Sequence, residues 1–81
     1  MMTKQEALTI VQNIARDVLD NDNILLTFET TTEAIEGWDS LNHIQIISEI
    51  QKNCRIKFSA NEMISWDNVG DLCESMAVKI I

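Results

Sequence analysis

Apolar residues recur at steps of three and four near the start of the chain, which predicts an amphipathic helix over about 4–19. Thr3 and Glu6 precede this pattern with the spacing of a capping box, in which each side chain bonds a backbone amide of the first turn. Asp and Asn fill positions 20–23 and favour a turn, so the helix should end there. The predicted stripe consists of Ala7, Leu8, Val11, Ile14, Ala15, Val18 and Leu19.

Two further helices are predicted by N-cap signals in the second half of the chain. Asp39 and Ser40 are both good N-caps, and the apolar pattern behind them runs to Cys54. Ser59 and Glu62 repeat the capping-box spacing before a brief apolar stretch, which predicts a short helix.

The last predicted helix, over about 67–79, has the most regular apolar stripe in the chain. No segment sustains the alternation typical of a strand. We therefore expect an all-α fold of four helices, the third of them short, with a long loop between the first and second. The stripe consists of Val69, Leu72, Cys73, Met76, Ala77 and Ile80.

The second predicted helix has apolar residues on two faces. At 100° per residue, Ile46, Ile47, Ile50 and Cys54 gather on one side, which should face the core. We expect Ile50 and Leu72 to be core residues on facing helices. The other side should leave Leu41 and Ile44 partly exposed beside Ser40, and it comprises Ser40, Leu41, Ile44, Gln45, Ser48 and Lys52.

The segment 20–39 follows neither the helical nor the strand period. Its apolar residues require it to lie against the core, and a structured loop of this length is usually functional. Gly37 allows a positive φ at its end. The apolar residues are Ile24, Leu26, Phe28 and Ile35.

The 81 residues make one domain, 1–81, with 46% hydrophobic and 23% charged residues, as expected for a globular protein. Apolar runs of three residues are far too short to span a bilayer, and residues 3–6 do not resemble the start of a signal peptide. We therefore expect a cytoplasmic monomer with no membrane insertion.

The net charge of −7 repels phosphate backbones, so nucleic acid is not an expected partner. This charge is unevenly distributed along the chain. Segment 17–39 carries seven acids and no base, whereas the net charge is +1 for 1–16, +2 for 40–57 and −3 for 58–81.

The residues that could bind metal or catalyse do not form known sites. Cys54 and Cys73 are expected to be free core thiols, since no CxxC motif or nearby His completes a metal set. A calcium loop counted from Asp20 fails, because its fifth, sixth and twelfth positions are Ile24, Leu25 and Thr31. We expect no metal site.

Ser40 and His43 are the one pair of residues that could form a hydrolytic Ser-His site. His43 follows Ser40 by about one helical turn, but no oxyanion hole is apparent, and a domain of this size should have little room for a pocket. We expect His43 to pack against a helix or face solvent, and the protein to be no enzyme.

Ser40 has a more informative context. It follows a long loop, Gly37 and Asp39, and it begins a helix whose free amides and positive dipole end suit a phosphate ester. The run Gly37–Leu41, Gly-Trp-Asp-Ser-Leu, resembles the Asp-Ser-Leu signature of acyl carrier proteins. Residues 56–58 and the Asn-Val-Gly-Asp-Leu run at 68–72 extend the resemblance over essentially the whole chain.

The resemblance implies an acyl-carrier-like four-helix bundle with 4′-phosphopantetheine as a covalent cofactor on Ser40. Asp39 and Leu41 would be the flanking residues of the motif. A separate Mg²⁺-dependent phosphopantetheinyl transferase would attach the group, whose thiol would carry an acyl chain as a thioester. Where such carriers protect the cargo, they use an apolar cleft between helices.

Partners implied by this role are the transferase, an acyl-loading ligase or acyltransferase, and downstream synthase or transferase enzymes. We expect them to dock beside Ser40, where exposed apolar side chains would anchor the interface and loop acids would steer a basic partner. The expected docking residues are Glu36, Ile44, Gln45, Ser48 and Lys52.

The second helix departs from carriers of fatty-acid synthesis, which place several acids there, because it holds Glu49 alone. The resemblance therefore leaves open fatty-acid-like synthesis and specialised synthesis of polysaccharides or secondary metabolites. An aminoacyl or peptidyl carrier is an alternative, although such carriers often have Gly where this chain has Asp39. An acidic helical interaction module with Ser40 as an N-cap is the alternative from another class.

Overall fold

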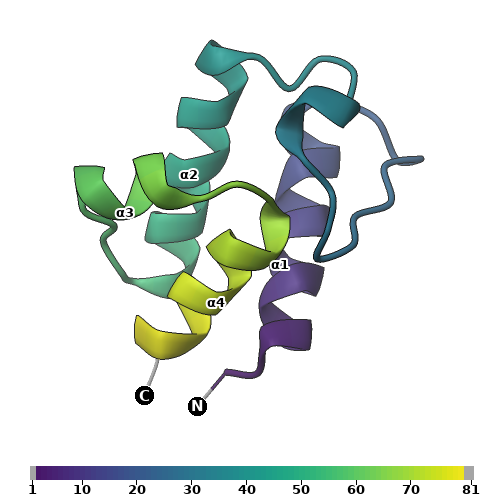
Figure 1. Cartoon of the computed structure of the whole chain (residues 1–81). Coiled ribbons are helices and arrows are strands. Elements are labelled where there is room, and N and C mark those ends of the chain that lie inside the picture. Colours follow the sequence, from purple (N-terminus) through teal and green to yellow (C-terminus); the bar gives the residue numbers. More distant parts are fainter. Residues whose placement is uncertain (1, 80–81) are drawn as a thin grey trace.

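The computed structural model describes residues 2–79 and is helical, without strands, over that range. The helices are α1 (Lys4–Val18), α2 (Ser40–Cys54), α3 (Ala60–Ser65) and α4 (Val69–Lys79), as Figure 1 shows. The predicted four-helix architecture with a short third helix is confirmed. The 3-10 helix η1 (Thr32–Ala34), within the long loop, was not predicted because a single turn leaves no periodic pattern.

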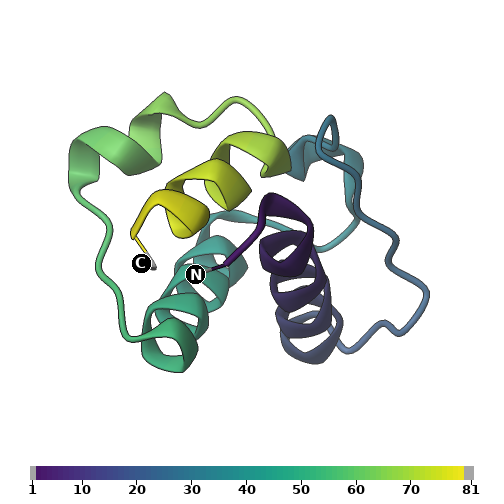
Figure 2. The same ribbon diagram turned by 90° about the horizontal axis from the view of Figure 1, so that it is seen from below.

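Helix α1 is the element against which α2 and α4 both pack (Figures 1 and 2). Ala7, Val11 and Ala15 are completely buried on it, and the two small side chains allow neighbouring helices to approach closely. The capping box at its start is present, since Glu6 N donates to Thr3 Oγ1 and Thr3 N donates to Glu6 Oε1. The hydrogen bond from the Thr3 amide, together with the Thr3 side chain, lowers the pKa of the exposed Glu6 carboxyl.

The face assignment of α2 agrees with the structure. Ile46, Ile47 and Ile50 are buried, and Cys54 is partly buried. Ile50 and Leu72 are both core residues as predicted, but α2 and α4 make closer contact with α1 than with each other. In the α4 stripe Ala77 is only half-buried, and Ile80 lies outside the described residues.

The loop between α1 and α2 is held in place by side chains of α1. Arg16 Nε donates to the Ile24 carbonyl at 2.8 Å, and the Leu26 amide donates to Gln12 Oε1 at 2.8 Å. Gln12 and Arg16 are four residues apart and share a helix face. They satisfy backbone groups that an irregular segment would otherwise leave unpaired, while Ile24 and Leu26 are buried as predicted.

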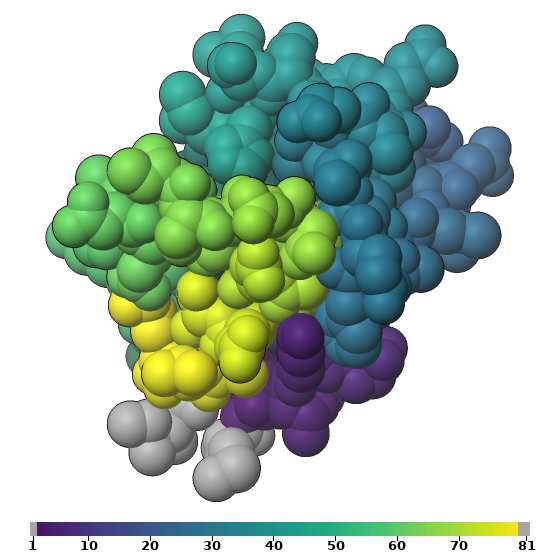
Figure 3. Space-filling model, viewed as in Figure 1, coloured from purple at the N-terminus to yellow at the C-terminus, as the bar shows by residue number. Residues whose placement is uncertain are grey.

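A second attachment joins this loop to the start of α4. The amides of Val69 and Gly70 donate to the carbonyls of Thr30 and Phe28, both at 2.8 Å. These are first-turn amides, which have no partner within their own helix. A Cβ atom on Gly70 would lie 2.6 Å from the Phe28 carbonyl oxygen, so only glycine permits this approach. Figure 3 shows the loop around residue 30 abutting the start of α4.

Both cysteines are free, as predicted. Cys73 is completely buried, and burial raises the pKa of its thiol to about 11. Burial also raises the pKa of the partly exposed Cys54 thiol. Neither thiol is therefore an activated nucleophile. Among the described helices, none is long and apolar enough to cross a membrane.

Replacing Gly70 with Ala tests the contact between the loop and α4. Alanine normally stabilises a helix interior by about 1 kcal/mol relative to glycine. Here the clash with the Phe28 carbonyl should reverse the sign and lower the free energy of unfolding by about 1–3 kcal/mol. Urea denaturation at pH 7 measures the difference.

Gly37→Ala is the comparison variant, since its Cβ would meet only Leu19 Cδ2 at 3.9 Å and would report the cost of the positive φ of 87° alone. A Gly70→Ala variant as stable as the wild type would show that the loop is free to move away from α4.

Candidate functional site

Asp39 is the N-cap of α2. Its backbone is extended, and its Oδ1 accepts the amide of Asn42 at 2.8 Å. The side-chain amide of Asn42 donates to the Gly37 carbonyl at 2.8 Å, and Gly37 has the predicted positive φ. Of the two candidate caps in the sequence, the structure therefore uses Asp39, and the interpretation of Ser40 as an N-cap is wrong.

Ser40 is consequently the first residue of the helix with its hydroxyl uncommitted. Its side chain is exposed, and within residues 2–79 the hydroxyl makes no hydrogen bond. The backbone amides of Ser40 and Leu41 likewise have no partner in the described part of the chain. An exposed hydroxyl beside two free amides at the positive end of a helix is suited to a phosphate ester.

The outer face of α2 extends from Ser40 as predicted. Leu41 and Ile44 are 75% and 67% exposed, so they leave apolar surface beside Ser40. Gln45, Ser48 and Lys52 continue the same exposed face, and Lys52 lies about 18 Å along the axis from Ser40. Glu36 is exposed in the loop that leads into the helix. The roles expected for these residues stay predictions.

The bond between Trp38 and His43 was not predicted from the sequence. The indole Nε1–H of buried Trp38 donates to His43 Nδ1 at 3.0 Å, with the rings tilted by 37°. With Asp39 as N-cap, these residues occupy the positions before the cap and four after it, which commonly form a hydrophobic staple. The five-residue spacing of Trp38 and His43 could have indicated this contact in the sequence, but only if Asp39 rather than Ser40 was taken as the N-cap.

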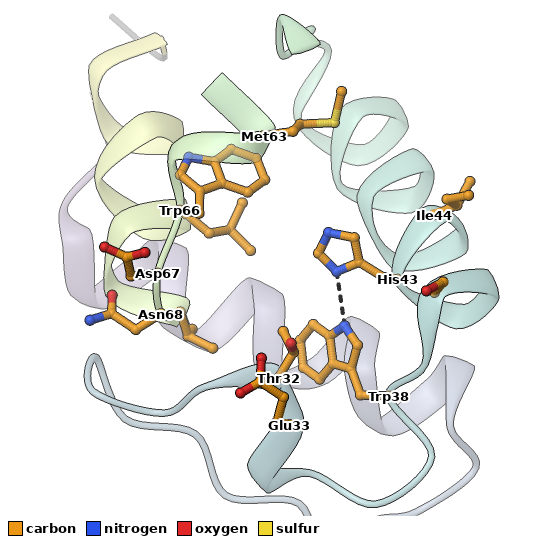
Figure 4. A pocket seen from close by; sticks show the side chains of 12 residues that line it. Thr32, Glu33, Trp38, His43, Ile44, Met63, Trp66, Asp67 and Asn68 are labelled. Carbon is orange, nitrogen blue, oxygen red and sulfur yellow. Dashed lines mark hydrogen bonds between the residues drawn. The ribbon is translucent and has the colours of Figure 1, made fainter. Parts of the chain in front are cut away.

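A pocket of about 420 Å³ opens beside this pair, contrary to the expectation of little room (Figure 4). Its walls come from η1, the first turn of α2, the end of α3 and the start of α4. The lining residues are Thr32, Glu33, Trp38, Ser40, His43, Ile44, Met63, Trp66, Asp67, Asn68, Val69 and Leu72.

The wall opposite α2 is fixed by Trp66. Its indole Nε1–H donates to Ser75 Oγ of α4 at 2.9 Å, and its ring meets Phe58 edge-on at 4.9 Å between centroids. The ion pair of Glu62 with Lys79, at 2.9 Å, also joins α3 to α4. The short helix is thereby held at one side of the pocket.

His43 is a neutral imidazole at neutral pH. It is half-buried, and desolvation lowers its pKa. Its Nδ1 accepts the Trp38 indole hydrogen and cannot also accept a proton from Ser40. A Ser-His nucleophile that uses Nδ1 is therefore excluded, and in the described part of the chain no three His, Cys, Asp or Glu side chains form a metal-binding group.

Comparisons with known proteins agree with this geometry. Residues 9–76 match the family described as "Phosphopantetheine attachment site". The fold is similar to the solution NMR structure of a holo acyl carrier protein from Geobacter metallireducens, with 38% identity and a TM-score of 0.84. That similarity covers 90% of this chain and 84% of the other. No curated protein sequence matches the chain.

The burial of His43, which lowers its pKa, predicts a stability loss on mild acidification. The folded-state pKa of His43 lies below its unfolded value of about 6.5, so the unfolded chain binds more protons between the two. The contribution of neutral His43 to the free energy of unfolding should therefore be fully present above about pH 6.5. It should be lost as the pH drops through the lowered pKa. Urea midpoints between pH 7.5 and 5.5 measure this loss.

His43→Gln is the matched variant, because its amide oxygen can still accept the indole hydrogen but the side chain does not titrate. Its urea midpoint should be flatter over this pH range. An equal slope in both proteins would show that His43 is not the group responsible for the loss.

Proposed function

Because this chain belongs to the phosphopantetheine attachment-site family and is an acyl carrier protein, we propose that Ser40 is the residue that carries its 4′-phosphopantetheine. The single observation that supports this assignment best is the uncommitted, exposed hydroxyl of Ser40 at the start of α2. The group supplies a thiol on which an acyl chain is held as a thioester.

The residues around Ser40 fit such a group. The hydroxyl oxygen is free to form a phosphodiester with the group, and the amides of Ser40 and Leu41 can donate to phosphate oxygens. Asp39 occupies the cap without using the serine, so modification need not disturb the helix. The pocket lined by Ser40, His43 and Trp66 lies beside the attachment point and is the candidate for the cleft that shelters cargo.

We propose that partner enzymes dock on the exposed face of α2. A phosphopantetheinyl transferase, an acyl-loading enzyme and a downstream synthase or transferase must each reach Ser40. Leu41 and Ile44 provide apolar surface next to it, and such small central anchors dominate the energy of many interfaces. Glu36 and Asp39 would attract a basic partner surface and mainly affect the association rate.

The charge of this face favours a specialised pathway over fatty-acid synthesis. Lys52 is exposed on the face, Glu49 is the one acid of α2, and the loop before the helix holds the negative charge. An enzyme with a basic surface matched to an acidic second helix would meet a cation at Lys52. We therefore propose enzymes that act on polysaccharide or secondary-metabolite precursors as the natural partners, and a noncatalytic role for the chain.

Ser40→Ala should abolish attachment of the group while leaving the fold intact. Since Asp39 is the cap, the substitution should change the free energy of unfolding by no more than about 0.5 kcal/mol. The measurement is intact mass after incubation with coenzyme A, Mg²⁺ and a broad-specificity transferase, together with urea denaturation.

Ser65→Ala is the control, because Ser65 is also an exposed serine but lies on α3, outside the expected docking residues, and its loss should not affect the mass gain. A Ser40→Ala variant that still gained the mass of the arm would move the attachment site to another serine.

Lys52→Glu tests the proposed pathway class. In an acyl transfer assay with a malonyl-transferring enzyme of a fatty-acid system, the wild type should be a poor acceptor, and restoring an acid should improve kcat/KM by about tenfold. The gain should shrink with added salt, since the pair is exposed.

Ile44→Ala is the companion variant, which should lower kcat/KM in both charge backgrounds by removing an apolar anchor. A wild type that already works well with this enzyme, and gains nothing from Lys52→Glu, would favour fatty-acid synthesis as the pathway.

A further inference from the structure

Three nitrogen-bearing rings line the pocket beside Ser40, and the protein already uses the N–H groups of two of them. The Trp38 indole hydrogen is bonded to His43, and the Trp66 indole hydrogen is bonded to Ser75. Figure 4 shows the imidazole of His43 between these two indoles, on the side of α2 that faces the pocket.

The Trp38 bond also determines where the proton of His43 resides. A neutral imidazole carries one N–H, and an atom that accepts a hydrogen bond cannot hold it. Because Nδ1 accepts from Trp38, the proton of the neutral ring is on Nε2. No hydrogen bond within residues 2–79 uses Nε2, so the pocket contains one ring donor available to a ligand.

We propose that His43 Nε2–H donates to a neutral carbonyl or hydroxyl oxygen of the loaded arm, so that the pocket prefers oxygen-bearing groups to saturated chains. This inference rests on Ser40 as the attachment site. Ser40 and His43 are one turn apart on α2 and line the same pocket. A group that folds back from Ser40 therefore reaches His43 before it reaches the far wall.

The preference follows from the cost of covering a donor. A saturated chain over His43 would remove water from Nε2–H and leave the donor unpaired, whereas an oxygen acceptor would replace the lost bond. The rest of the wall offers apolar contact from Met63, Trp66 and Leu72. In a small pocket, one polar group within a mostly apolar wall usually fixes the orientation of the bound ligand.

The charges at the rim favour a neutral occupant. Glu33 and Asp67 line the same pocket, and their carboxylates would repel an anionic acyl group. Two neutral sources of oxygen remain, namely the amide carbonyls of the arm itself and an oxygen substituent on the acyl chain. They share the same chemistry, and differently loaded chains separate them.

The experiment compares three forms of the full chain, made with a transferase and the matching coenzyme A derivatives: the unacylated holo form, the butanoyl form and the 3-hydroxybutanoyl form. Intact mass first verifies loading at Ser40. NMR of the imidazole nitrogens and their protons then reports the environment of His43 Nε2. Cleavage of the two thioesters by hydroxylamine reports protection of the cargo.

The expected result is a downfield shift of the Nε2 proton on loading. A shift already present in the holo form would identify the arm carbonyls as the acceptor, and one confined to the 3-hydroxybutanoyl form would identify the cargo. In the second case cleavage should also be slower by about two- to tenfold than for butanoyl, the range that one neutral hydrogen bond supplies.

Variants at His43 distinguish a donor from a packing role. His43→Phe keeps a ring but has no donor, and should lose the protection, whereas His43→Gln retains both an acceptor for Trp38 and a donor, and should keep it. Trp38→Phe removes the bond that determines the tautomer and should give an intermediate result.

An Nε2 proton unchanged in every loaded form would overturn the inference. Where the shift is confined to the 3-hydroxybutanoyl form, equal protection in His43→Phe and the wild type would overturn it as well. Failure to load at Ser40 would instead overturn the proposed function. The two failures are therefore distinguishable in one set of samples.

Discussion

The site depends on the contact between the α1–α2 loop and the start of α4. Two first-turn amides of α4 need acceptors, the carbonyls of Phe28 and Thr30 need donors, and a missing side chain at Gly70 lets the two backbones meet. This arrangement holds the loop at the start of α4, and Thr32, Glu33, Trp38 and Ser40 from the residues that follow line one wall of the pocket. A side chain at Gly70 would separate that wall from the core.

At the start of α2, neighbouring residues have different structural roles. Asp39 satisfies the helix, Trp38 and His43 join the loop to the first turn, and Ser40 is left with no structural duty. A single serine that had to cap the helix would have its oxygen committed to a backbone amide. The Ser40 hydroxyl is therefore left free because Asp39 caps the helix and Trp38 and His43 join the loop to it.

The helices were predictable because their signals are local. Capping boxes at Thr3 and Ser59 and the two faces of α2 follow from residues a few positions apart, and the structure contains them as expected. The pocket was not predictable, since it joins η1, α2 and the α3–α4 connection, which are distant in sequence. The requirement for glycine at position 70 was also not predictable, because it comes from the carbonyl of Phe28, which is distant in sequence.

The burial of Cys73 has a chemical consequence in a protein that carries a thioester. A thioester exchanges with any thiolate that can reach it, so a protein that bears such a bond endangers it with its own thiols. With a pKa of about 11, the Cys73 side chain is a thiolate in only about one molecule in ten thousand at pH 7, and the core covers it. Burial in the core thus makes this thiol unreactive toward a thioester on the same chain.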